Sequence, residues 1–299
     1  MDDVWILWEW PYDRHFVEAI LEDADAVGVT ALAIGPSAMG DALARLRAAL
    51  DAPKVVVDRA SDALDSARDI AALARLRGAV VMNDPERVGA AVDKARMHLA
   101  LMSIGVDVPW TLVAPALSQD PTWQWDHDAR IGRPFVIKPS HGSGGDGVVV
   151  DATCEQDVAM ARDARPTEAH LLQEFVPAAD LAGRPAYFRA IYCLGQVDAC
   201  FWDPRTRRYA LPGPEDEGSP WIERLSALSR SIARVAAMAL FSTEVAMTAD
   251  GRLVAVDYVN DMCDLRLASR HPDGIPDSVV RRVSRRIAEV TARLVRPGP

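Results

Sequence analysis

The sequence has little of what several protein classes need. Its 299 residues carry 33 Lys and Arg against 43 Asp and Glu, so the formal net charge is −10. Nucleic-acid binding depends on basic side chains that neutralise phosphates, and we expect no nucleic-acid partner. No apolar run approaches the ~18 residues of a membrane-spanning helix, and the acidic start lacks a signal-peptide pattern. We therefore expect a cytoplasmic protein with no membrane partner.

Cysteine and histidine are also scarce. The six histidines are scattered, and the four cysteines form no CxxC pair and no zinc-ligand spacing: Cys154, Cys193, Cys200 and Cys263. A disulfide framework and a zinc module are therefore not expected, and the thiols should be reduced. The hydrophobic content of 49% and charged content of 25% are ordinary for a globular chain, whose length allows two or three compact units.

The most informative segment is PFVIKPSHGSGGDGVVV, residues 134–150, in which Lys138 precedes a glycine-rich loop. Gly142, Gly144 and Gly147 satisfy GxGxxG, but three valines follow, where a Rossmann dinucleotide site would begin a helix. The predicted order is strand, loop, strand and helix. That order is typical of a flap whose backbone N–H groups cover phosphates.

Other interpretations of this loop fit less well. A Walker loop needs Lys followed by Ser or Thr after its last glycine, and a protein kinase needs HRD and DFG segments, none of which is present. A glycine hairpin without a ligand remains open. We predict that the next helix starts at Thr153, with Gln156 completing a capping box.

Upstream of the flap, strand and helix patterns alternate. We predict strands over 4–10, 30–34, 54–58 and 79–82, and helices over 13–26, 40–50 and 61–76. This alternation indicates an open α/β unit that ends near residue 83. Asp58 and Arg59 follow a strand at the end where such sheets bind ligands, and an ion pair in a loop is the alternative.

The following segment is predicted to hold one helix that begins at Asn83, carries Asp93 and Lys94, and ends at Gly105. A strand over 110–114 and a connector over 115–130 should come next. After the flap and its helix, we place a second boundary near residue 178.

Asp250-Gly251 lies between two strand-like runs and is a strong signal for a two-residue hairpin turn. Such a turn predicts three opposing pairs: Ala249 with Arg252, Ala246 with Ala255, and Glu244 with Asp257. Directly opposed carboxylates destabilise a sheet unless a cation lies between them, and Mg²⁺ prefers carboxylate oxygens. A longer turn that leaves two solvated acids is the alternative.

Together these segments resemble the ATP-grasp superfamily, most closely its RimK-like carboxylate–amine ligases. The resemblance runs from about residue 83 to residue 266 through NDPERVGAAVDKARMHLAL, PFVIKPSHGSGGDGV, LLQEFVP, FRAIYCLGQV and EVAMTADGRLVAVDYVND. It implies a fold of mixed α/β and α+β class. An N-terminal open α/β (pre-ATP-grasp) domain over 1–83 would precede a central subdomain with the flap over 84–178. A C-terminal subdomain with the metal hairpin over 179–299 would complete the clasp around ATP.

The resemblance also implies site residues. Arg189 and Lys138 would be catalytic, with Arg189 stabilising charge on the reacting carboxylate. The residues expected to bind ATP are Lys94, Lys138, Ser143, Gly144, Gly145, Gly147, Gln173, Glu174, Phe175, Val176 and Asp180. The ligands expected for Mg²⁺, or for Mn²⁺ in its place, are Glu244, Asp257 and Asn260.

One departure from the family concerns the metal strand, which usually ends in Glu-x-Asn. Here Asp257 and Asn260 are three residues apart, so they lie on opposite faces of a regular strand unless it bulges. Asp261 or Asp264 are alternative ligands.

The activity implied is ATP-dependent formation of an amide through an acyl phosphate, giving ADP and phosphate, from small-molecule or peptide carboxylates and amines. Arg205, Arg207 and Arg208 could recruit an anionic substrate, or form a solvated turn. A phosphotransferase acting on a small-molecule hydroxyl and a non-catalytic nucleotide-binding module are the alternatives. Assembly into a homo-oligomer is left open.

Overall fold

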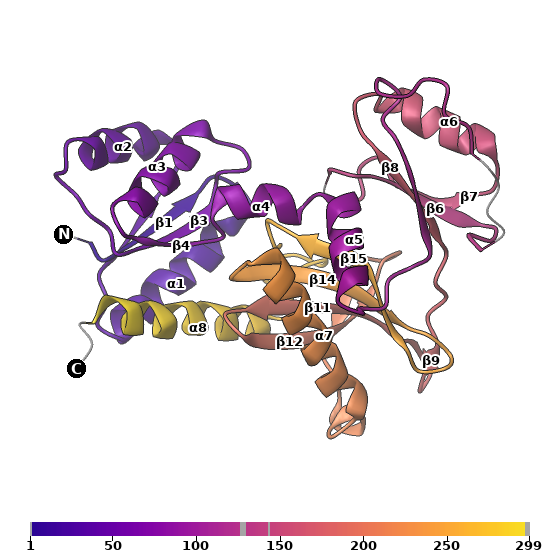
Figure 1. Cartoon of the computed structure of the whole chain (residues 1–299). Coiled ribbons are helices and arrows are strands. Elements are labelled where there is room, and N and C mark those ends of the chain that lie inside the picture. The colour runs from indigo at the N-terminus through magenta and orange to yellow at the C-terminus, as the bar shows by residue number, and fades with distance from the viewer. Residues whose placement is uncertain (1, 126–129, 143, 297–299) are drawn as a thin grey trace.

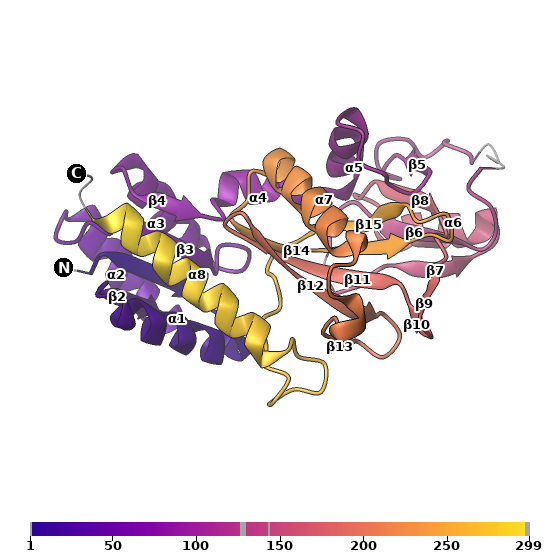
Figure 2. The ribbon, with the colours of Figure 1, turned by 90° about the horizontal axis from the view of Figure 1, so that it is seen from below.

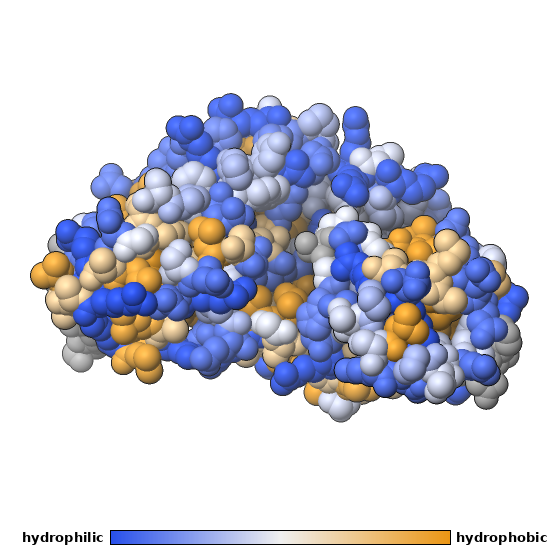
Figure 3. Space-filling model, turned by 90° about the horizontal axis from the view of Figure 1, so that it is seen from above, coloured by the Kyte–Doolittle hydropathy of each residue, from blue (hydrophilic) through white to orange (hydrophobic). Residues whose placement is uncertain are grey.

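The computed structural model describes residues 2–125, 130–142 and 144–296. Its elements form an N-terminal α/β unit and two further sheets that lie side by side (Figure 1). Seen from above, the surface is largely hydrophilic and is hollowed between the two ends of the molecule (Figure 3). In the part of the chain that the structure describes, no helix combines the length and apolar character needed to cross a bilayer.

The N-terminal unit is a parallel sheet in the order β2-β1-β3-β4. Its strands are β1 (Val4–Trp8), β2 (Ala31–Ile34), β3 (Val55–Arg59) and β4 (Val80–Met82). Its helices are α1 (Arg14–Ala26), α2 (Met39–Arg47) and α3 (Asp65–Leu76). Alternate residues of β1 enter different cores: Val4 and Ile6 face α1, whereas Trp5 and Leu7 face α2 and α3. The predicted strands and helices of this unit are confirmed, with ends shifted by a few residues.

The single helix predicted from Asn83 to Gly105 is wrong, because the segment forms α4 (Pro85–Ala91) and α5 (Lys94–Ser103). Asp93 interrupts the helix, since its carboxylate accepts from the N–H of Arg96 at 3.1 Å and caps α5. Asn83 is buried and joins two parts of the chain. Its side chain donates to the carbonyl of Leu240 at 2.6 Å and accepts from the N–H of Leu240 at 3.0 Å.

The central sheet is antiparallel, in the order β5-β8-β6-β7. Its strands are β5 (Thr111–Ala114), β6 (Phe135–Pro139), β7 (Val149–Ala152) and β8 (His170–Glu174). The next helix is α6 (Glu155–Ala164), so the predicted capping box is wrong by one residue. Cys154 is the N-cap, and the carboxylate of Asp157, not Gln156, accepts from the N–H groups of Thr153 and Cys154 at 2.7 and 3.1 Å.

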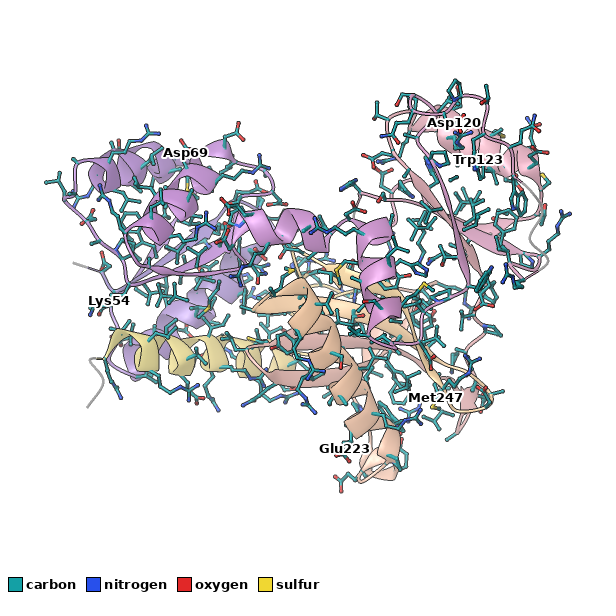
Figure 4. All side chains as sticks on the ribbon, in the orientation of Figure 1. Lys54, Asp69, Asp120, Trp123, Glu223 and Met247 are labelled. Carbon is teal, nitrogen blue, oxygen red and sulfur yellow. The ribbon has the colours of Figure 1, made fainter. Side chains whose placement is uncertain are left out.

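The connector after β5 contains turns and no helix within residues 115–125. Arg162 of α6 holds it, donating to the carbonyls of Asp120 and Trp123 at 2.7 and 3.4 Å. These two residues lie together beside α6 (Figure 4). Residues 126–129 of the predicted connector lie outside the described residues.

The third sheet is antiparallel, in the order β13-β12-β11-β14-β15. Its strands are β11 (Tyr187–Cys193), β12 (Gln196–Asp203), β13 (Arg208–Ala210), β14 (Leu240–Met247) and β15 (Leu253–Asn260). A small hairpin, β9 (Asp180–Leu181) with β10 (Arg184–Pro185), precedes it, and α7 (Pro220–Ala236) covers one face. The predicted boundaries at residues 83 and 178 fall between β4 and α4 and between β8 and β9, and they stay predictions.

The last helix, α8 (Asp277–Val295), returns to the N-terminal unit and packs along α1 (Figure 2). Ser284 donates to Asp23 of α1 at 2.6 Å. Lys54, at the far end of the N-terminal unit (Figure 4), donates to the carbonyl of Val295 at 3.2 Å. The first and last described elements therefore share one core, which also contacts the third sheet through Ile191 and Cys200.

Candidate nucleotide and metal site

The glycine-rich flap connects β6 to β7, as predicted from the sequence. Gly144 and Gly145 are exposed, with φ of 65° and 82°. Gly147 has φ 75°, a backbone conformation that favours glycine, and a Cβ there would lie 2.8 Å from Nε of Arg165. Arg165 also forms an ion pair with Asp146 of the flap. Ser143, expected at this loop, lies outside the described residues.

Lys94 and Lys138 approach the flap from two elements. Lys94 begins α5, and its Nζ donates to the carbonyl of Gly142 at 2.6 Å. Lys138 lies in β6, and its Nζ donates to the carbonyl of Val256 in β15 at 2.6 Å. Burial lowers the pKa of Lys138, and Lys94 adds to this, while Asp257 and Glu244 oppose it. Lys94 therefore contacts the flap, and Lys138 contacts the third sheet.

The β14–β15 hairpin, predicted to bind the metal, has a different turn from the one predicted. Thr248 N–H donates to the carbonyl of Arg252 at 2.9 Å, which leaves a three-residue loop with Gly251 at φ 81°. Val245 lies opposite Ala255, and Ala246 lies opposite Val254. The predicted pairing of Ala246 with Ala255 is therefore wrong.

The predicted pairing of Glu244 with Asp257 is nevertheless confirmed. The register shifts between Glu244 and Val245, so Val256 is an extra residue on β15. An extra residue in a bulge leaves the ladder, and the carbonyl of Val256 instead accepts from Lys138. The bulge thus opposes the two carboxylates and turns a backbone oxygen toward the lysine.

A second shift lies between Ser242 and Glu244, where Tyr258 and Val259 together face one residue of β14. Tyr258 and Val259 are both buried in the core beneath α5 and α7. Asn260 then lies opposite Ser242, on the strand face that carries Asp257. The three-residue spacing that departs from Glu-x-Asn is therefore compensated by a bulge.

The donors on this face are two carboxylates and one amide. No three or more His, Cys, Asp or Glu side chains are grouped for a metal among the described residues. However, amide and carboxylate oxygens are the donors that suit Mg²⁺, which keeps waters and substrate oxygens for its remaining positions. The chemistry of Glu244, Asp257 and Asn260 therefore fits a hard divalent cation.

Arg189 lies next to Glu244 on the neighbouring strand β11. Its Nη2 is 3.1 Å from Oε1 of Glu244. Its Nη1 donates to the hydroxyl of Tyr209 at 3.0 Å, and its guanidinium lies 4.9 Å from the ring centre of Trp202. Tyr187, two residues earlier on β11, donates to Oε2 of Glu244 at 3.1 Å. Burial raises the pKa of Glu244, Arg189 lowers it, and Asp257 raises it further.

Sequence reasoning missed the residues that hold Arg189 and Glu244. Tyr187 was detectable, because residues two apart on a strand share a face. Trp202 and Tyr209 were not, since their contact with Arg189 depends on the pairing of β12 with β11 and β13.

The segment expected at the adenine divides into two parts. Gln173 and Glu174 belong to β8, which is paired on both sides. The side chain of Gln173 donates to Tyr258 and Thr111, each at 3.0 Å, which ties β8 to β15. Phe175 and Val176 follow the strand, and their backbones make no hydrogen bond with the described residues. They are the part of the segment available to a ligand.

Two further candidates have structural partners. Asp180 accepts from the N–H of Gly183 at 2.8 Å and so closes the β9–β10 turn. Arg59 does not pair with Asp58: it forms a buried ion pair with Asp13 at 2.7 Å. Burial raises the pKa of Asp58 to about 6, although the N–H groups of Ala60 and Ser61 favour its charged form.

The alternative metal ligands lie close by but are engaged elsewhere. Asp261 accepts from the side chain of Asn83 at 2.8 Å. Burial raises the pKa of Asp261 to about 7. Asp264 pairs with Arg266 at 2.7 Å. The arginines of the β12–β13 turn are exposed, and Arg205 lies 3.9 Å from Asp203.

No protein-family model and no curated protein sequence matches this chain. Solved structures do. The ATP-grasp ligase PsnB, complexed with precursor peptide PsnA2 and AMPPNP, has 14% identity and a TM-score of 0.64, with 98% of each chain covered. A RimK domain ATP-grasp protein from Sphaerobacter thermophilus DSM 20745 has 20% identity and a TM-score of 0.62, covering 98% of this chain and 99% of that one.

The D-cycloserine synthetase DcsG has 17% identity and a TM-score of 0.62, again covering 98% of this chain and 99% of its own. PsnB has also been solved with a minimal precursor, Mg and ADP. These likenesses extend over nearly the whole chain at low identity, and they confirm the predicted fold: the chain has the ATP-grasp fold.

Proposed function

We propose that the protein is an ATP-dependent carboxylate–amine ligase. The observation that carries this proposal is the arrangement around Glu244. Arg189 contacts Glu244 at 3.1 Å, Asp257 lies opposite it, and Lys138 donates to the bulge residue beside Asp257. Two cations and two carboxylates thus lie together, and one of the cations, Lys138, is on the strand that leads into the glycine flap. Cations can bind the triphosphate and the substrate carboxylate, and the two acids can bind a metal ion that bridges phosphates.

In the proposed reaction, a substrate carboxylate attacks the γ-phosphate of ATP, ADP leaves, and an amine then displaces phosphate to form the amide. Lys94, Lys138 and the flap N–H groups would bind phosphate oxygens. Arg189 would orient the carboxylate and stabilise its developing charge. Glu244, Asp257 and Asn260 would hold Mg²⁺, which neutralises phosphate charge when bound. No nucleophilic side chain is needed.

The structural neighbours support a ligase more than the alternatives. The PsnB ligase is solved with a precursor peptide, MdnC is a macrocyclase bound with precursor peptide MdnA, and DcsG is a D-cycloserine synthetase. We propose peptides or small amino acids as the substrate class. Turnover with pooled carboxylates and amines is the test: a ligase releases ADP and phosphate only when both pools are present. Release of ADP with a phosphorylated product would instead indicate a phosphotransferase.

The lysines permit a sharper test, because the chain has only three: Lys54, Lys94 and Lys138. The probe is a synthetic ATP derivative whose γ-phosphate carries an acyl group. When it binds, a nearby lysine amine takes the acyl group and ATP leaves. We expect mass spectrometry to find the acyl group on Lys94 or Lys138, and excess ATP to block it. Lys54, which is exposed at the far end of the N-terminal unit, is the internal control. Labelling that ATP does not block would contradict the nucleotide site.

The matched variants are Lys138→Met and Lys54→Met. Lys138→Met keeps an apolar stem of similar length and removes the charge, so we expect ATP turnover to fall by at least about 100-fold. Lys54→Met should retain turnover. ADP formation near the wild-type rate in Lys138→Met would refute the role of this lysine.

A further inference from the structure

A second hollow lies away from the flap, beside the open edge of β4. Its volume is about 620 Å³, within the usual range of ligand pockets. It is lined by β4 and the start of α4, by the β11–β12 turn, by the segment between α7 and β14, and by the end of α8. We call it the edge groove. We propose that the edge groove docks an extended acidic segment of a partner peptide. This proposal does not depend on the ligase assignment.

The first support is the backbone of β4. This strand is at the edge of its sheet, and among the described residues it pairs only with β3. Val80 N–H donates to the carbonyl of Lys54 at 2.9 Å, toward β3. Because successive residues of a strand direct their amide groups to opposite sides, the N–H and carbonyl of Val81 point away from β3. Val80, Val81 and Met82 all line the groove. An edge with free backbone groups can accept an added strand.

The second support is the chemistry of the walls. Val80 and Leu294 both line the groove, and each is 44% exposed. Arg87 and Arg293 also line it, and both are exposed. Neither guanidinium has a hydrogen-bond or ion-pair partner within the described chain. The acid of the groove, Asp84, is already engaged, since it pairs with Arg75 and accepts from the N–H of Glu86.

The available charge of the groove is therefore positive, although the whole chain carries −10. An extended peptide places successive side chains on opposite sides. A strand that alternates acidic and apolar residues can thus pair with β4, cover Val80 and Leu294, and present carboxylates to Arg87 and Arg293. A second copy of this chain fits less well, because pairing β4 with β4 would bring like-charged arginines together.

The edge groove is separate from the nucleotide site. It touches β11 and its turn at Tyr192, Leu194 and Gly195. Tyr192, the nearest of these to Arg189 on β11, follows it by three residues, which span about 10 Å in an extended strand. We therefore expect ATP and a peptide in the groove to bind at the same time.

The test uses a fluorescein-labelled hexapeptide of alternating Val and Glu and measures fluorescence anisotropy with the full chain. We expect saturable binding below about 1 mM that weakens as salt rises. The variant Arg87→Glu/Arg293→Glu should bind at least about tenfold more weakly. Its matched control, Arg230→Glu/Arg270→Glu, makes the same charge change at exposed arginines outside the groove, and should bind like the wild type.

Two further peptides distinguish the contacts. A peptide with Lys in place of Glu should not bind, and one N-methylated at alternate amides should bind at least about tenfold more weakly, because it cannot pair with β4. Failure of the Glu peptide to bind, or equal binding by the Arg87→Glu/Arg293→Glu variant, would overturn the proposal. A third outcome would also overturn it: sedimentation that shows a dimer of the wild type and of the control variant but a monomer of Arg87→Glu/Arg293→Glu. The groove would then bind a second copy of the chain.

Discussion

Two arginine–carboxylate pairs differ in how completely their hydrogen-bonding capacity is used. Arg59 and Asp13 share two hydrogen bonds of 2.7 Å, Arg59 also donates to the carbonyl of Cys263 at 3.0 Å, and both side chains are 1% exposed. Arg189 and Glu244 meet through one contact of 3.1 Å, with side chains 15% and 16% exposed. Within the described chain, the buried Nε of Arg189 has no partner.

The difference follows from what surrounds each pair. Asp13 immediately precedes α1, Arg59 ends β3, and Cys263 follows β15, so the saturated pair joins the N-terminal unit to the segment after the third sheet. Glu244 instead faces a second acid, Asp257, and lies near Lys138. The saturated pair has little capacity left for a ligand. The unsaturated pair keeps charge and donors that a substrate could use.

The largest effect should come from the unsaturated pair. Arg189→Met removes the donor expected at the reacting carboxylate, so we expect turnover to fall by about 100- to 1000-fold. The midpoint of urea unfolding should also fall, because Glu244 then faces Asp257 without its cation. Steady-state ADP release measures the turnover, and urea titration measures the unfolding midpoint. Wild-type turnover in the variant would mean that Arg189 has a structural role like that of Arg59.

The saturated pair should affect stability and not turnover. Asp13→Asn leaves Arg59 buried without its anion, which should lower the free energy of unfolding by about 3–5 kcal/mol. The folded fraction should keep its turnover number. The control is Glu22→Gln, which breaks the exposed pair with Arg281 and should cost less than about 1 kcal/mol. A cost for Asp13→Asn no larger than this control would show that the pair does not anchor the fold.

The sequence predicts the fold of these regions better than the contacts between them. The alternating strands and helices before Asn83 and the flap around Lys138 follow from local signals: apolar periodicity, valine runs and glycine. The packing of α8 on α1 is not predicted, because nothing local in residues 277–295 indicates which helix they meet. The saturated pair was missed for the same reason, since its members are 46 residues apart.

The β14–β15 hairpin illustrates the limit most clearly. The sequence predicts that Glu244 faces Asp257, but from a two-residue turn, whereas the observed loop is longer and a bulge at Val256 restores the opposition. The position of a bulge depends on packing, here the burial of Tyr258 and Val259 on one side. The roles of these acids toward a metal stay predictions.

A third prediction concerns Asp58, which precedes Arg59 of the saturated pair. Burial raises the pKa of Asp58 to about 6, from 3.8 in the unfolded chain. The folded state therefore binds the proton of Asp58 more tightly than the unfolded state does. The free energy of unfolding is highest below pH 4, where Asp58 is protonated, and it falls as pH rises from about 4 to 6. The shift corresponds to roughly 2–3 kcal/mol. Asp58→Asn should remove that part of the pH dependence. Identical pH profiles of urea unfolding would contradict it.

The smallest expected effect separates the two facing acids of the unsaturated site. In the absence of metal, Asp257→Asn removes repulsion and should leave the protein as stable as the wild type, or more stable by up to about 1 kcal/mol. Glu244→Gln removes the same repulsion but also the ion pair with Arg189, so it should gain less or lose slightly. Mg²⁺-ATP raises the melting temperature if it binds only the folded state, and this rise should shrink in both variants if each of them loses a proposed metal ligand. Thermal unfolding with and without Mg²⁺-ATP measures both quantities.

Two outcomes would contradict these expectations. A full Mg²⁺-dependent rise of the melting temperature in both variants would show that neither acid is a metal ligand. Equal metal-free stabilities of the two variants would show that the ion pair of Arg189 with Glu244 contributes nothing to stability.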